Sequence, residues 1–545
     1  MLKSWIKVRS FGGADSVTGS CHMVTATIEG YDYNYLVDCG LFQGRIARKQ
    51  PELNFNLRPY ACDISAIFVT HAHIDHIGRI PAMYRWGYRN PIYATAPVVE
   101  LSAIMLEDSA KIQLSDYSAM VKKELSKKYR GEEYEDVELL YELTDAIDVM
   151  DQFVPVEREK EIEVTPFLTV TFYDVGHGLG SSAIKLCFNN GEETCNLLFS
   201  GDLGNANNPI LKTPEFQYHY DIDAVFVETT YAGRFHGSQE ENWGMVREEI
   251  AKTILAGGRV IVPAFAVGRT QELLYLFYED MTSNDDCVSE IFRKTKFYVD
   301  SMLAVAATRV FMKFPEEFNS KIREMAENNK SPFYFSNLEL IEPKEKSIEL
   351  QNSRQPCIII SAAGMCDAGR VIFHLQDAIE KPENLVVLTG YQGDGTLGRK
   401  LIDGESMVKI AKKQCHVRAR ILSINTLSGH ADQNGIMQWL YNIEPGYELF
   451  LIHGEPEAQQ EFKKFLEDVY GINVVHCPTI QVDGEPQELQ VERRKRGKNN
   501  EFNRKKKVTL LEEQLQDTEG CFGCETLRNK LAKEINEVKS IRRGR

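Results

Sequence analysis

The sequence has no apolar run long enough to cross a bilayer. Its longest apolar stretches, such as residues 357–364, have the length of a strand and are interrupted by small or polar side chains. A membrane-spanning helix needs about 20 consecutive apolar residues. The sequence therefore predicts a soluble protein with no membrane partner.

The chain also lacks an excess of basic residues. It has 63 lysines and arginines against 79 aspartates and glutamates, which gives a formal charge of −16. This balance argues against a uniformly basic coat for nucleic acid, but it leaves a local basic groove or arm open.

A secretion signal is not visible, because the first ten residues contain no apolar core, and the 12 cysteines are scattered along the chain. We therefore expect free thiols in a reducing compartment and a cytoplasmic protein. Cys521 and Cys524 form a single Cys-x-x-Cys, which is half of a four-cysteine zinc site. With no second pair nearby, we expect them to be structural or redox-neutral.

The length of 545 residues, of which 43% are hydrophobic, predicts two or three domains with buried cores. In the first part, β-branched runs that end in polar loops indicate strands, and a charged stretch with helical spacing indicates helix over residues 98–152. A second block begins near residues 223–228. Its strands alternate with helices and predict a parallel, Rossmann-like sheet, at residues 260–263, 357–360 and 385–388.

Three glycine-containing loops follow the strands of this second block. Loops after parallel strands collect at the carboxyl edge of a sheet, where ligands bind. The alternative is that their glycines only make turns. The candidate loops are residues 268–270, 361–365 and 390–399.

A cluster of metal-binding side chains follows the strand that ends at Thr70. Three histidines and one aspartate lie within six residues: His71, His73, Asp75 and His76. Imidazole and carboxylate are ligands that suit zinc, and a loop lets neighbouring side chains converge. The same pattern of a strand end followed by histidine or aspartate recurs at His177, Asp202 and His453. Each recurrence alone is weak, but together they indicate one metal centre.

At these motifs the sequence resembles the metallo-β-lactamase-fold nucleases with an inserted β-CASP domain. The family includes bacterial ribonucleases and the endonuclease of messenger-RNA 3′-end processing. Asp38, the cluster of residues 71–76, His177 and Asp202 resemble the four motifs of the metal fold, and Glu228, His430 and His453 resemble three additional β-CASP motifs. The resemblance covers about residues 5–485, and its one departure within the motifs is Gly429, where alanine is usual.

The resemblance implies an α/β protein, with a metallo-β-lactamase αββα sandwich and an inserted Rossmann-like β-CASP domain. The expected domains are residues 1–232 and 419–490 for the metal fold, residues 233–418 for the insert, and residues 491–545 for a basic linker and helical extension. Between residues 493 and 507 there are nine basic residues and one acidic residue, so residues 493–545 carry +8 and residues 1–492 carry −24.

The resemblance also implies the roles of the site residues. Two Zn²⁺ ions per chain are expected, one held by His71, His73 and His177, the other by Asp75, His76 and His453, with Asp202 bridging them. Asp38 would orient a ligand histidine; the alternative is a strand-end turn residue. His430 would donate a proton to the leaving oxygen and Glu228 would hold its tautomer, unless both are structural or extra ligands.

A histidine at the position of His453 goes with RNA-cleaving members, so the implied substrate is single-stranded RNA. Ser361, Arg269, Arg399 and Ser428 are expected to contact it. Three alternatives are a DNA nuclease of the same family, a small-ester or thioester hydrolase of the same fold, and an inactive RNA-binding scaffold. The sequence leaves open a homodimer, the partner of the C-terminal extension, and endonucleolytic against 5′-to-3′ exonucleolytic cutting.

Overall fold

The computed structural model describes residues 5–130, 137–215, 217, 219–237, 239–283, 285–390, 392–393, 395–424, 427–470, 475–478 and 488–490. The expected basic extension, with Cys521 and Cys524, lies outside the described residues. Within the described part, no helix is both long enough and apolar enough to cross a membrane.

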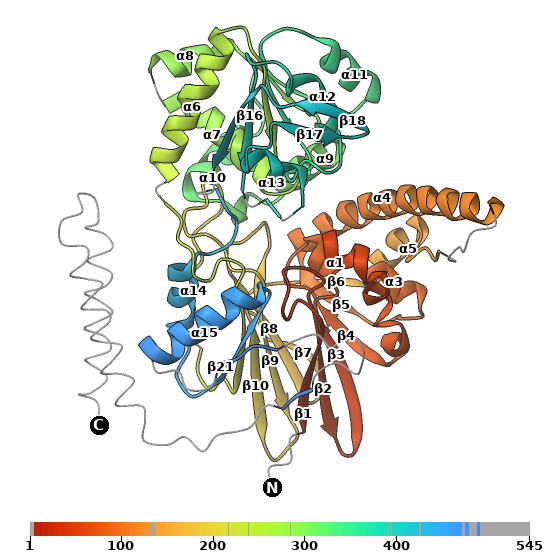
Figure 1. The fold of residues 1–545 in the computed structure, drawn as a ribbon. Helices are drawn as coiled ribbons and strands as arrows, with labels where there is room; N and C mark the ends of the chain where they lie inside the picture. The colour runs from red at the N-terminus through yellow and green to blue at the C-terminus, as the bar shows by residue number, and fades with distance from the viewer. Residues whose placement is uncertain are drawn as a thin grey trace, which may run out of the picture.

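Two seven-stranded sheets form the lower body of the molecule (Figure 1). The first sheet has the order β22 (Glu488–Gln490), β1 (Ile6–Gly12), β2 (Cys21–Ile28), β3 (Tyr31–Val37), β4 (Ile64–Phe68), β5 (Ile92–Thr95) and β6 (Phe153–Val156). The second has the order β21 (Val475–His476), β20 (Glu448–Ile452), β11 (Ala224–Glu228), β10 (Thr194–Phe199), β9 (Ser182–Asn189), β8 (Leu168–Asp174) and β7 (Ile162–Thr165).

Large apolar side chains hold the two sheets face to face. Tyr35 of β3 packs on Phe188 of β9 with ring centroids 5.8 Å apart, and both side chains are buried. In β11, Phe226 points into this core while Val225 and Val227 point to the other face, because successive side chains of a strand alternate. The second sheet is therefore buried on both faces.

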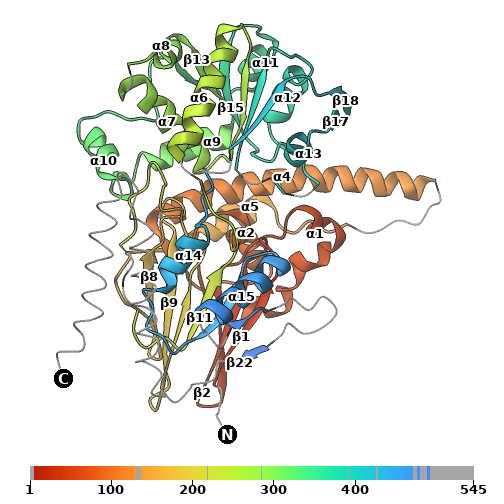
Figure 2. The same cartoon turned by 60° about the vertical axis from the view of Figure 1, so that its left-hand side comes forward.

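Helices cover the outer faces of both sheets (Figure 2). Helices α14 (Gln433–Leu440) and α15 (Pro456–Tyr470) pack on the second sheet. On the first sheet lie α1 (Gly44–Lys49), α2 (Ile74–Ile77), α3 (Ile80–Arg85), α4 (Ala96–Tyr129) and α5 (Leu143–Asp148), with the 3-10 turns η1 (Pro51–Phe55), η2 (Arg58–Asp63) and η3 (Val149–Gln152). This arrangement is the expected αββα sandwich.

The helix expected over residues 98–152 is shorter in the structure. Helix α4 ends at Tyr129, and residues 137–142 are not helical. A new helix, α5, begins after Glu142, whose backbone N–H donates to the Asp145 carboxylate over 2.8 Å. This capping arrangement starts a separate helix where apolar spacing alone predicts continuity.

A six-stranded parallel sheet forms the inserted domain, which lies above the sandwich in Figure 1. Its order is β14 (Leu338–Leu340), β13 (Lys296–Val299), β15 (Cys357–Ser361), β12 (Val260–Pro263), β16 (Leu385–Thr389) and β19 (Arg420–Ile424). The domain also contains α6 (Gln239–Leu255), α7 (Arg269–Ser283), α8 (Cys287–Lys294), α9 (Met302–Phe311), η4 (Pro315–Glu317), α10 (Ser320–Glu327), α11 (Lys344–Asn352), α12 (Val371–Ala378), α13 (Leu397–Ile402) and the hairpin β17 (Met407–Ile410) and β18 (Lys413–His416). The expected Rossmann-like alternation of strand and helix is confirmed.

Strand β11, near which the second block was expected to begin, pairs with β10 and β20 of the sandwich and lies within residues 1–232, which were assigned to the metal fold. Strand β19 pairs with β16, so the inserted sheet continues past residue 418, where the domain was expected to end. Each is a short apolar run, and such a run does not specify its partner strand.

Candidate metal centre

The first element of the centre is a hydrogen-bonded pair of strand ends. Strands β3 and β4 are parallel neighbours, so Asp38 after β3 lies beside the loop after β4. The Asp38 carboxylate accepts a hydrogen bond from the backbone N–H of Thr70 over 2.8 Å, and lies 2.7 Å from Nδ1 of His76. Asp38 therefore fixes the orientation of the His76 ring and leaves its Nε2 to face the centre.

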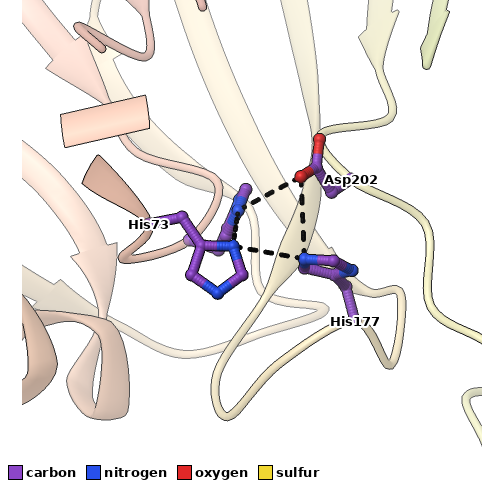
Figure 3. A group of neighbouring side chains, drawn as sticks. His73, His177 and Asp202 are labelled. Carbon is purple, nitrogen blue, oxygen red and sulfur yellow. Dashed lines mark hydrogen bonds and ion pairs between the residues drawn. The ribbon is translucent and has the colours of Figure 1, made fainter. Parts of the chain in front are cut away.

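One group of ligand atoms comes from three separate loops. Nδ1 of His73 lies 3.0 Å from Nε2 of His71 and 3.4 Å from Nε2 of His177. Oδ2 of Asp202 lies 3.4 Å from His71 Nε2 and 3.6 Å from His177 Nε2. Figure 3 shows His73, His177 and Asp202 pointing toward one another. Four ligand atoms within 4.8 Å of one another are spaced to surround one ion.

A second group lies on the other side of Asp202 and consists of Asp75, His76 and His453. Nε2 of His453 lies 3.6 Å from Oδ2 of Asp75, and Nε2 of His76 lies 3.4 Å from Oδ1 of Asp202. The two oxygens of Asp202 thus face different groups, which is the arrangement that a bridging carboxylate needs.

The unpartnered atoms of the centre fit a bound cation. Nε2 of His76, Nε2 of His453 and Oδ1 of Asp202 are buried and have no hydrogen-bond partner among the described residues. Buried polar atoms are nearly always paired. All three atoms are of the kinds that bind metal and belong to the ligand groups of this centre, so the donor set suits the two zinc ions that the family pattern implies.

The protonation states point the same way. Burial, reinforced by the neighbouring His76, lowers the pKa of His71 to about 3, and burial lowers the pKa of His73 and of His177. These three rings are therefore neutral at ordinary pH, which is the form that binds metal. Burial opposes ionisation of Asp202, but the surrounding histidines outweigh it and hold its pKa well below the usual range.

His430 and Glu228 lie beside the first group. Nδ1 of His430 is 3.1 Å from Oε1 of Glu228, which is fully buried and also accepts the backbone N–H groups of Leu203 and Thr230. Burial lowers the pKa of His430, but the carboxylates of Glu228 and Asp202 outweigh it and raise the pKa to about 9. The imidazole is therefore protonated on both nitrogens and positively charged at neutral pH, and Nε2 is available to donate its proton.

One residue of this site, Asn205, has no counterpart among the sequence predictions. Its backbone N–H donates to the Gly429 carbonyl over 2.9 Å and its side-chain amide donates to the Ser428 carbonyl over 3.1 Å. Asn205 follows Asp202 by three residues, so it fastens the loop before His430 to the loop after the shared ligand. The only signal in the sequence is its closeness to Asp202.

The backbone at Gly429 does not require glycine, because its φ is not positive. A Cβ at this position would lie 3.4 Å from Cε1 of His177, which is an ordinary van der Waals contact. An alanine, usual at this position in the family, therefore also fits.

The structure places the four expected RNA contacts in different surroundings. Ser428 adjoins the centre, and its Oγ accepts the backbone N–H of His430 over 3.3 Å. Arg399 is exposed and lies 3.0 Å from Asp403. Ser361 and Arg269 are buried: the Ser361 hydroxyl donates to the Asp300 carbonyl over 2.7 Å, and Arg269 pairs with Glu272.

Two of the three glycine-containing loops, residues 361–365 and 390–399, contact each other at the carboxyl edge of the inserted sheet. Gln392 donates to the Gly364 carbonyl over 3.1 Å, and the backbone N–H of Ala264 donates to the Ser361 carbonyl over 3.0 Å. Glu272 also accepts the Asn208 amide over 2.9 Å, which links this edge to the loop after Asp202.

Three family descriptions match successive parts of the chain. They are the metallo-beta-lactamase superfamily over residues 18–264, the Beta-Casp domain over residues 270–401, and the Zn-dependent metallo-hydrolase RNA specificity domain over residues 414–478.

Similar proteins span most of the chain. Ribonuclease TTHA0252 of Thermus thermophilus is 31% identical over 85% of this chain and 96% of its own length. An RNase J-like protein of Methanocaldococcus jannaschii is 28% identical over 83% of this chain and 93% of its own length. Transcription termination factor FttA of Methanosarcina mazei is 27% identical over 83% of this chain and 68% of its own length.

Proposed function

This chain belongs to the β-CASP group of the metallo-β-lactamase superfamily, and from that premise we propose that it is a zinc-dependent ribonuclease that hydrolyses single-stranded RNA. The observation that carries the proposal is the position of Asp202. One of its oxygens faces His71 and His177 and the other faces His76. A protonated His430 lies beside the same carboxylate, 3.9 Å from its Oδ2.

The residues divide the work of hydrolysis between them. His71, His73 and His177 would hold one zinc ion, Asp75, His76 and His453 the other, and Asp202 both. When bound, the ions supply Lewis acidity that activates water and neutralises charge on the phosphate. Asp38 keeps Nε2 of His76 directed at the centre, because it occupies the Nδ1 of that ring.

His430 supplies the proton that the leaving oxygen needs. Hydrolysis forms a bond between the water oxygen and phosphorus and breaks the bond from phosphorus to the 3′ oxygen. That oxygen leaves with a proton from Nε2 of His430, because Nδ1 is occupied by Glu228. Glu228 favours the charged ring before the step and fixes which nitrogen faces the substrate.

Four observations support RNA over the alternatives. Residues 414–478 match an RNA specificity domain, and His453 occupies the position at which the resemblance implies RNA cleavage. A similar protein is named a ribonuclease and matches 96% of its length. The inserted domain also gives the chain a second body over the sandwich, which a small-ester hydrolase does not need.

The test compares substrates and variants on one preparation. A 5′-phosphorylated RNA, an internally labelled RNA, their duplexes and DNA of the same sequence are incubated with the zinc-loaded protein, and the products are resolved by length. Cleavage of the single-stranded RNA in preference to the others is expected, with loss in Asp202→Ala. Turnover of DNA at an equal or greater rate would reject the proposal, as would hydrolysis of a thioester without cleavage of RNA.

A further inference from the structure

Phe235 exposes an aromatic ring in the segment that contacts the loop of the acid residue His430. It follows β11, and 61% of its surface is open to solvent. The residues before it, Gly233 and Arg234, are exposed as well. Most large aromatic side chains of a folded protein contribute to its core. An exposed phenylalanine in a segment bound to the loop of the proton donor is therefore a candidate contact for the substrate.

The backbone on both sides of Phe235 is fastened to the His430 loop. On one side, the Gly233 N–H donates to the Gln433 side chain over 3.0 Å, and the Gln433 N–H donates to the Arg234 carbonyl over 3.1 Å. On the other side, the His236 N–H donates to the Asp432 carboxylate over 3.1 Å. Phe235 is thus held in place relative to His430.

The side chain of His236 brings this segment to the acid itself. Nε2 of His236 lies 2.9 Å from the backbone carbonyl of His430. The buried ring of Tyr231 lies 4.9 Å from the ring of His236 and 6.1 Å, at 20°, from the ring of His430. Phe235 is therefore the direct neighbour in sequence of a residue, His236, that contacts the His430 backbone.

We propose that Phe235 is a base-stacking residue for the nucleotide whose 3′ oxygen leaves. The inference rests on the proposed function. That 3′ oxygen must come within hydrogen-bond reach of His430 Nε2, about 2.6–3.2 Å, for the proton to be transferred. The base on the same ribose then lies near the acid. Phe235 is the exposed aromatic residue of the segment in which the next residue, His236, contacts the His430 backbone. Aromatic stacking binds single-stranded nucleic acid without sequence preference, because every base has a π face.

The experiment combines a protein change with a substrate change. Phe235→Ala and the unaltered protein are assayed on a short RNA with one cleavage position and on the same RNA lacking only the base 5′ of that position. For the unaltered protein, removal of the base should lower kcat/KM about 5- to 100-fold, which is the usual range for one stacked base. Phe235→Ala should show the same loss on intact RNA, and no further loss on the abasic RNA, because both changes remove one interaction.

Two variants control for general effects. Phe235→Trp keeps an aromatic face and should retain most of the activity on intact RNA. Tyr31→Ala removes another exposed aromatic ring, from the start of the strand that ends beside Asp38, about 20 Å from the metal centre at a rise of ~3.3 Å per residue. It should behave like the unaltered protein on both substrates. Zinc content should be equal in all four proteins.

The outcomes separate the inference from the proposed function. Cleavage of both RNAs with the same base-dependent loss in Phe235→Ala as in the unaltered protein would overturn the stacking role and leave the ribonuclease intact. A zinc-loaded protein that cleaves neither RNA would overturn the ribonuclease, and the stacking role with it.

Discussion

Nδ1 of His430 lies 3.1 Å from Oε1 of Glu228, although the two residues are 202 positions apart in the sequence. The whole inserted sheet lies between them in the chain. The pair therefore forms only when the chain returns from the inserted domain to the sandwich. Its consequence is electrostatic, because the buried carboxylate keeps the imidazole charged.

Glu228→Gln should shift the pH dependence of cleavage. In the unaltered protein the pKa of His430 is about 9, so the rate should fall as pH rises through that value. Without the negative charge the pKa drops toward the ordinary value near 6.5, and the falling limb moves to lower pH. Rate profiles for single turnover measure the shift. An unchanged falling limb would assign the proton donor elsewhere.

His430→Ala should reduce turnover by roughly 10² to 10⁴ with both zinc ions retained. An RNA with sulfur at the leaving 3′ position provides the control, because a thiolate leaves without a proton. The defect should largely disappear on that substrate. A defect that persists together with loss of zinc would instead make His430 a ligand.

Asp38→Ala should weaken one zinc site more than the other. The change removes the carboxylate 2.7 Å from His76 Nδ1, so the ring loses its orientation and zinc affinity should fall about 10- to 100-fold at the group of Asp75, His76 and His453. Asp202→Ala should lose more than one ion, because it faces both groups. Competitive zinc titration measures both effects. Equal loss at both sites in Asp38→Ala would contradict the assignment.

Asn205→Ala should lower kcat and leave KM and zinc content nearly unchanged. The side chain holds the Ser428 carbonyl, and one such hydrogen bond contributes about 1 kcal/mol, or roughly fivefold in rate if its loss appears only in the transition state. Asn207→Ala, two residues away and exposed, is the matched control. A rise in KM with constant kcat would place Asn205 in substrate binding instead.

Truncation after residue 492 should weaken RNA binding and flatten its dependence on salt. The removed residues carry +8 while residues 1–492 carry −24, so the loss removes a concentrated attraction for phosphate. The cut keeps β22, which pairs with β1. Cleavage of a saturating short RNA should remain. Its complete loss in a folded, zinc-loaded protein would show that the extension builds the active form.

The sequence by itself determined the centre of this protein. Its ligands come within a few residues of the end of an apolar run. His71 follows the run that ends at Thr70, and Asp202 lies three residues after Phe199, so the strand ends could be located before the fold was known. Parallel strands place such ends along one edge, and the structure brings the seven expected ligands into two groups that meet at Asp202. The α/β class and the parallel inserted sheet follow from the same runs.

The tertiary structure alone decided which neighbours those residues have. Nothing in the spacing of β11 specifies its sheet, because a fully buried strand is apolar on both faces. Strand β19 is partly exposed and contains Arg420 and Ser423, and its pairing with β16 appears only in the structure. The sequence predicts that Arg269 contacts phosphate. In the structure Arg269 forms a buried ion pair with Glu272, one helical turn away. The contact of His236 with the His430 carbonyl and that of Asn205 with the Ser428 carbonyl each join residues about 200 positions apart. Long-range packing of that kind leaves no periodic signal in a single sequence.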